Sequence, residues 1–172
     1  MRYIHCTQKL IKEINPNTVS KGVEREVKGL GDWYANIFWI EKKAHIIFTN
    51  VKTLYSFIVP EIYRDDIENF GKIFVFGFIQ SLEGIGVSRE LIFRILEEYS
   101  EFEIVKTNSR SIIASMNDHI YHFRGFVEDG RMKSLKDVDV FNKNILRLPS
   151  GAMQYMTPLE KFNELIENEF KN

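Results

Sequence analysis

The sequence has one cysteine, Cys6, among its 172 residues, and it lacks any long apolar stretch. A single cysteine excludes an internal disulfide framework and a cysteine-rich zinc site, and it is typical of a reducing compartment. The longest apolar run, residues 73–79, is far shorter than the roughly 20 residues that span a bilayer. The first residues, MRYIHC, also lack the apolar core of a signal peptide. We therefore expect a cytoplasmic protein with no membrane partner.

An excess of charge of one sign is missing as well. Twenty-three Lys and Arg residues face 24 Asp and Glu residues, for a formal net charge of -1. Such a chain has no overall field to attract nucleic acid, so nucleic acid is not an expected partner. Acidic residues nevertheless concentrate within residues 61–103. This stretch predicts a solvated acidic helical face, and a docking surface for a protein partner is the alternative.

Motifs of the common enzyme classes are also absent. The sequence contains no phosphate-binding GxxxxGK[ST], no dinucleotide-binding GxGxxG, no HExxH, no GxSxG and no EF-hand loop. Whether the chain is an enzyme therefore stays open, with a non-catalytic role preferred. We expect no cofactor and no metal site.

The hydrophobic pattern, with 44% hydrophobic residues, predicts one α+β domain over residues 1–172. Aromatic and β-branched residues fill three runs separated by short turns, which predicts an antiparallel meander over residues 34–59. Short strands are expected near residues 3–6 and 102–106. Apolar residues at spacings of three and four predict helices elsewhere, packed largely on one face of a mainly antiparallel sheet. The polar, glycine-containing segment 15–32 predicts a loop that is either functional or mobile.

Two predicted strands each run into a helix start that carries hydroxyl and cationic side chains. The free amides of a helix start and the positive end of its dipole favour a phosphate or a carboxylate, especially beside Lys or Arg. If the two strands are neighbours, both helix starts open at the same edge of the sheet. The simpler interpretation is that Thr7 and Ser109 only cap their helices. The candidate ligand-binding residues are Thr7, Lys9, Lys106, Asn108, Ser109 and Arg110.

A polar stripe on the helix after Arg110 suggests a catalytic alternative. Asp118 and His122 lie one helical turn apart, so they could orient a general base or supply two metal ligands. A zinc centre needs a third ligand, which His5, His45, His119 or a distant carboxylate could offer. Cys6 neighbours His5 in the chain, but adjacent strand residues point to opposite faces, so a buried inert thiol is expected. The candidate catalytic residues are thus His5, Asp118, His119 and His122.

Several phrases resemble a family of small bacterial and phage-borne proteins that is catalogued as a domain of unknown function. The most specific are HCTQKL, which starts at His5, and KTNSRS, which starts at Lys106 and is followed by SMND at Ser115. Less specific phrases are DWYAN from Asp32, FTNVKTLYSFIVP from Phe48, and LPSGAMQYMTPLEKF from Leu148. The resemblance covers nearly the whole chain and implies a single cytoplasmic domain, without an assigned activity.

Three functional hypotheses follow. The first is a non-catalytic binding or regulatory domain that recognises a small anionic ligand, or a partner's phosphate or carboxylate, at the two helix starts. The second is an enzyme acting on phosphate esters or RNA, in which Asp118 works with His119 or His122 and with His5. The third is a protein-protein interaction module that uses the acidic face.

Overall fold

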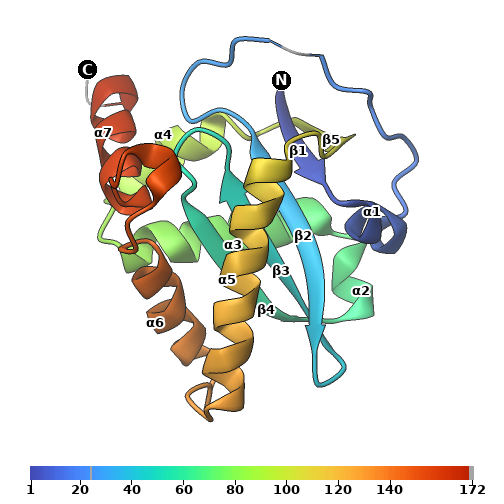
Figure 1. Cartoon of the computed structure of the whole chain (residues 1–172). Coiled ribbons are helices and arrows are strands. Elements are labelled where there is room, and N and C mark those ends of the chain that lie inside the picture. Colours follow the sequence, from blue (N-terminus) through green and yellow to red (C-terminus); the bar gives the residue numbers. More distant parts are fainter. Residues whose placement is uncertain (24, 171–172) are drawn as a thin grey trace.

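A five-stranded mixed sheet organises the computed structural model, which describes residues 1–23 and 25–170 (Figure 1). The strand order across the sheet is β4-β3-β2-β1-β5. The strands are β1 (Arg2–Cys6), β2 (Trp33–Ile40), β3 (Lys43–Asn50), β4 (Ser56–Ile62) and β5 (Phe102–Lys106).

The predicted meander is confirmed. Strands β2, β3 and β4 pair antiparallel, with Trp33 opposite Asn50 and Phe48 opposite Phe57. Strand β4 continues through Pro60, beyond the predicted end at residue 59. A proline is tolerated there because β4 is an edge strand and its residues need not all donate to a neighbour.

The two short strands are also confirmed, and both join the sheet parallel to their neighbours. Strand β1 pairs with β2 on one side and with β5 on the other. Between β1 and β2 the chain makes a crossover that contains α1 (Gln8–Ile14), which is the connection that parallel strands require. The sheet is therefore antiparallel along its longer strands and parallel where β1 lies.

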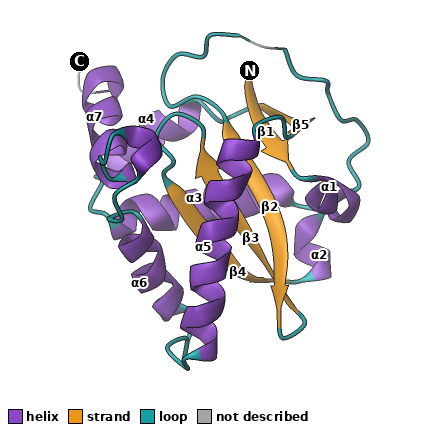
Figure 2. Cartoon of the chain, in the orientation of Figure 1, coloured by secondary structure: helices purple, strands orange, loops and turns teal. Residues whose placement is uncertain are grey.

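Helices cover both faces of this sheet (Figure 2). The expectation that they pack largely on one face is not confirmed, because β2 and β3 are apolar on both sides: the side chains of β2 are buried at seven of its eight positions. The remaining helices are α2 (Arg64–Ile67), α3 (Phe70–Gly84), α4 (Arg89–Glu97), α5 (Arg110–Glu128), α6 (Lys136–Ile145) and α7 (Pro158–Phe170), with a 3-10 turn at Gly151–Met153.

The first face carries an aromatic core beneath α1, α3, α4 and α7. Trp33 on β2 lies at its centre, with its ring 4.9 Å from that of Phe78 and 5.5 Å from that of Phe74 on α3. Helix α3 approaches the sheet closely at Gly77, where a methyl group would collide with Val59. This contact brings the helix axis close to β4.

The opposite face packs against α5 and α6. Tyr34 and Phe38 on β2 meet Met116 and Phe123 on α5, all nearly excluded from solvent. His45 on β3 belongs to this layer and stacks on Phe38 with ring centroids 5.3 Å apart. The alternation of side chains along β2 thus divides the core into two layers.

Both edges of the sheet are covered within the described part of the chain. At β4, the buried side-chain amide of Asn142 on α6 accepts from the Ile58 amide at 2.9 Å and donates to the Ile58 carbonyl at 3.1 Å. At β5, Ser20 of the long loop donates to the Ile104 carbonyl and bridges to Val105. The loop therefore protects an edge strand that would otherwise be open to pairing.

Side chains cap several of the helices. The hydroxyls of Ser88 and Ser109 each accept an amide from the first turn of α4 and α5. Thr157 and Glu160 form the reciprocal capping box that precedes α7, with donor-acceptor distances of 2.8 and 3.1 Å. Within the described residues, none of the helices combines the length and apolar character that a bilayer crossing needs.

Candidate functional site

The carboxyl ends of β1 and β5 lie side by side. Cys6 pairs with Lys106, and the Thr107 amide donates to the Cys6 carbonyl at 3.3 Å. From this edge the chain leaves in opposite directions: α1 packs on the aromatic face and α5 on the other. Ligands of open sheets with parallel strands bind at the carboxyl edge where neighbouring connections diverge in this way. The two strands are therefore neighbours, as the prediction required, but the helices that follow them lie on opposite faces of the sheet.

The start of α5 is organised by Tyr34. Its hydroxyl accepts from the amides of Asn108 at 3.3 Å and Ser109 at 3.0 Å, and it donates to the Asn108 side-chain oxygen. Ser109 in turn caps the Ile112 amide at 3.4 Å. Two first-turn amides, those of Arg110 and Ser111, have no acceptor within the described chain. These two donors remain available to an anion.

The start of α1 differs from the prediction. The Thr7 hydroxyl donates to the Asn36 side-chain oxygen at 2.8 Å, and no side chain caps the helix. Thr7 fails to cap because β2 extends past the end of β1 and offers Asn36 as a closer partner. The expected capping role of Thr7 is wrong, and its hydroxyl ties α1 to β2 instead.

Three cationic side chains surround this edge. Lys9 on α1, Lys106 at the end of β5 and Arg110 at the start of α5 are exposed. None of them forms an ion pair with another described residue. Lys106 and Arg110 add positive charge at the start of α5, whereas Lys9 belongs to α1 on the opposite face of the sheet.

His5 lies just before this edge in a polar cluster that involves Asp32. Its ring stacks on Tyr34 with centroids 4.6 Å apart, and its Nε2 atom lies 3.8 Å from an Asp32 carboxylate oxygen. Burial raises the pKa of Asp32, but hydrogen bonds from His5 and the Tyr3 amide and the charge of Arg25 outweigh it, so the net shift is downward. Asp32 is therefore held as a carboxylate.

The candidate catalytic residues on α5 lie apart from that cluster. Asp118 and His122 are exposed on the helix, and neither contacts His5, whose partners are Asp32, Tyr34 and the Lys106 carbonyl. His119 is largely buried, which lowers the pKa of its imidazole to about 4. Within residues 1–23 and 25–170, no three His, Cys, Asp or Glu side chains gather as a metal site would need.

Cys6 faces the aromatic core, on the opposite side of β1 from His5. It is completely buried as a free thiol, and burial raises its pKa well above the ordinary value. The strand alternation that separates Cys6 from His5 was readable from the sequence. By contrast, sequence reasoning missed the roles of Asp32 and Tyr34, whose only signal was their place in the phrase DWYAN.

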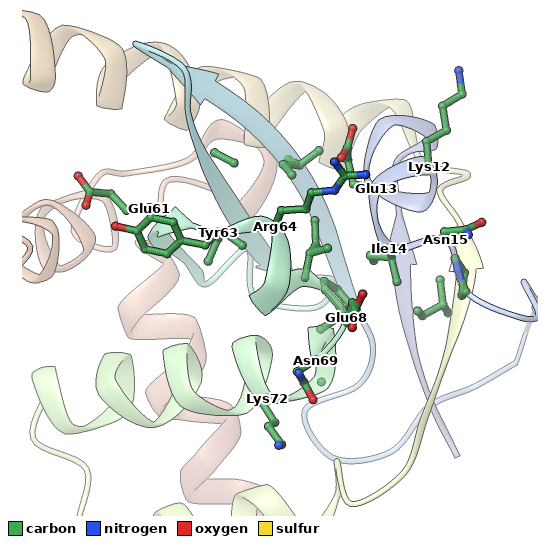
Figure 3. Close-up of a pocket in the computed structure, with 18 of the residues that line it drawn as sticks. Lys12, Glu13, Ile14, Asn15, Glu61, Tyr63, Arg64, Glu68, Asn69 and Lys72 are labelled. Atoms are coloured by element: carbon green, nitrogen blue, oxygen red, sulfur yellow. The ribbon is translucent and has the colours of Figure 1, made fainter.

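A large groove of about 1520 Å³ opens elsewhere, between α1, α2 and the start of α3 (Figure 3). Ile37 and Ile104 from the sheet and Phe70 from α3 form part of its floor. Charged side chains, among them Lys12 and Arg64, stand at its rim. None of the six ligand-binding residues that the sequence suggested lines this groove, because α1 lies between it and the carboxyl edge of β1.

A family model matches residues 3–161, which include both strand-to-helix junctions and every residue of the groove. The model is described as a domain of unknown function, DUF6933. The chain belongs to this family. The sequence resemblance to a family of this description is thereby confirmed. No curated protein matches the sequence.

Proposed function

We propose that this protein is a non-catalytic binding domain that recognises an anionic group, a phosphate or a carboxylate, at the carboxyl edge of β1 and β5. One observation carries the proposal: the amides of Arg110 and Ser111 begin a 19-residue helix without an acceptor among the described residues, and the exposed cations Lys106 and Arg110 flank this helix start in the chain. Free amides at the positive end of a helix dipole bind anions.

The surrounding residues support this assignment. Tyr34 holds the Asn108–Ser109 segment in place through its hydroxyl, so the two free amides are fixed before a ligand arrives. Lys9, at the start of α1 after the neighbouring strand β1, would add a third cation at this edge of the sheet. The buried, unreactive Cys6 is consistent with a reducing compartment, and we place the protein in the cytoplasm.

The catalytic alternative has less support. A phosphate-ester or RNA-acting enzyme of the kind considered above needs His5 beside Asp118 or an imidazole of α5, whereas His5 contacts Asp32. The binding function requires no such convergence. It needs only donors and positive charge at one edge of the sheet, and these are present in Lys106, Arg110 and the first turn of α5.

The test is a titration of the ¹⁵N-labelled protein with inorganic phosphate and with acetate, followed through amide chemical shifts. We expect the largest shifts at Arg110 and Ser111. Replacing Lys9 and Arg110 together with alanine should weaken phosphate binding about tenfold, as expected for the loss of one or two charge-assisted contacts, and leave the fold intact.

The matched control replaces Lys136 and Arg147, two exposed cations on and after α6, with alanine. It should bind phosphate like the wild type. Equal phosphate affinity in the Lys9→Ala/Arg110→Ala protein and the wild type, or shifts confined to other regions, would reject the site.

A further inference from the structure

We propose that the groove between α1, α2 and α3 docks an acidic, amphipathic segment of a partner protein. This surface is separate from the proposed anion site, and the inference goes beyond the proposed function. It stands on the size of the groove, its apolar floor and the sign of the charge at its rim.

The size of the groove favours a peptide segment over a metabolite. Its volume of about 1520 Å³ exceeds the roughly 300–1,000 Å³ of most small-molecule pockets. Five floor residues come from β2, β4, α3 and β5, and all belong to or pack against the aromatic core: Ile37, Ile62, Phe70, Phe102 and Ile104. Ile37 and Phe70 are fully buried, and the other three are half-buried, so part of the floor faces the open groove. Helical segments bind such grooves through their apolar face.

The rim of the groove carries an excess of positive charge. Five cationic and three acidic side chains line it, and Lys43 is already paired with Glu61. Of the remaining cations, Lys12, Arg64 and Lys72 are exposed and have no ion-pair partner among the described residues. A partner segment with both bulky apolar side chains and carboxylates would place its apolar groups on the floor and its negative charges against the cations of the rim.

This positive rim contrasts with the sequence around it. Residues 60–104 hold ten acids and four bases, yet two of those four bases, Arg64 and Lys72, lie at the groove. The fold adds Lys12 from α1, so basic side chains far apart in the sequence gather at one opening. In Figure 3, Arg64 extends from α2 toward α1, across the space that a docked segment would occupy.

Aromatic side chains at the rim favour a protein partner. Trp39 is 40% exposed and Tyr63 is 70% exposed, and both line the groove. Tryptophan, tyrosine and arginine are the residues that most often dominate the binding energy of protein interfaces. Trp39 also provides a spectroscopic probe, because Trp33, the other tryptophan, is completely buried.

The experiment selects binders from a phage-displayed library of random dodecapeptides on the full-length protein. Each round is depleted on the charge-reversed variant Lys12→Glu/Arg64→Glu/Lys72→Glu, whose thermal unfolding is first shown to match the wild type. We expect the selected peptides to combine an excess of Asp and Glu with bulky apolar residues. Synthetic copies should change the Trp39 fluorescence and should bind the charge-reversed variant at least tenfold more weakly.

A matched control, Lys133→Glu/Lys136→Glu/Arg147→Glu, changes three exposed cations away from the groove and should keep the peptide affinity within about twofold of the wild type. The Lys9→Ala/Arg110→Ala variant should also retain peptide binding, which separates this proposal from the anion site. Peptides without an acidic excess, equal affinity for the charge-reversed variant, or no selected peptide would overturn the proposal. Self-association of the wild type that the charge reversal abolishes would assign the groove to a second copy and overturn it too.

Discussion

The phenol oxygen of Tyr34 lies 3.0 Å from the amide nitrogen of Ser109, so the middle of the sheet is bonded to the first turn of α5. The same oxygen accepts the Asn108 amide at 3.3 Å. Tyr34 is 2% exposed, and its hydrogen bonds to these two amides are partly buried. This one side chain connects the core to the candidate anion site.

Replacing Tyr34 with phenylalanine should destabilise the protein by about 1–3 kcal/mol, because two partly buried amides lose their acceptor. Urea unfolding measures the effect. Tyr121→Phe is the control, since that tyrosine is 74% exposed. Hydrogen exchange of the Asn108 and Ser109 amides should quicken in Tyr34→Phe alone. Unchanged stability would show that solvent substitutes for the hydroxyl.

Two helical glycines should respond to alanine in opposite directions. At Gly77 on α3, an added methyl group would overlap Val59 and lie 2.9 Å from the Phe57 ring, so Gly77→Ala should cost about 1–3 kcal/mol through overpacking. At Gly125 on α5, an added methyl group would have no described atom within 4 Å apart from its chain neighbours and the backbone of its own helix. Gly125→Ala should therefore stabilise the protein by up to about 1 kcal/mol through helix propensity. Thermal unfolding of both variants decides the matter. A Gly77→Ala protein as stable as the wild type would contradict the close approach of α3.

The Asn142 side chain should matter more than its place on a polar helix suggests. Asn142→Leu removes both hydrogen bonds to Ile58 and leaves two backbone groups of β4 unpaired, which should cost about 2–4 kcal/mol. It should also expose the β4 edge and promote aggregation on heating, measurable by light scattering. Asn144→Leu, at an exposed position of the same helix, should show neither effect.

The buried His45 should make stability depend on pH. Burial lowers its pKa to about 4 from an ordinary 6.5, so between these values the unfolded chain binds a proton that the folded protein does not. The free energy of unfolding should therefore be highest above pH 6.5 and fall as the pH decreases toward 4. This one group should account for a loss of about 2 kcal/mol between pH 7 and pH 5.

Urea unfolding at both pH values tests this expectation. His45→Gln should lose less stability on acidification than the wild type does. Asn144→Gln, which changes a non-titrating side chain at an exposed position, should keep the wild-type pH dependence. His119, whose pKa is also lowered to about 4 by burial, should contribute in the same direction as His45. An identical pH dependence in His45→Gln and the wild type would contradict the prediction.

Local patterns were sufficient for the secondary structure. Alternating aromatic and β-branched residues predicted the meander. The turns, which the structure places at residues 41–42 and 51–55, are too short for a crossover and can join only antiparallel strands. Ser109 was predicted as a cap because a capping hydroxyl needs only neighbours within three residues. The seven-residue α1 was predicted in the same way, although its first hydroxyl was assigned the wrong partner.

The candidate sites depended on contacts that no local pattern contains. The sequence suggested that the segments at Thr7 and Ser109 could meet, and the parallel pairing of β1 with β5 places them at one edge. Tyr34 and Asp32 joined this region only through the fold. The groove was not foreseen, because Lys12, Trp39 and Arg64 belong to elements whose packing brings them together.

The sequence alone thus established a composition with one cysteine and almost no net charge. It also determined the strands and most helix starts, since each depends on residues a few positions apart. The tertiary structure decided which face each helix covers, how the sheet edges are closed and where donors and cations gather. Those features depend on side chains that are distant in the chain and meet only when burial of the two apolar faces of β2 brings α3 and α5 to opposite sides of the sheet.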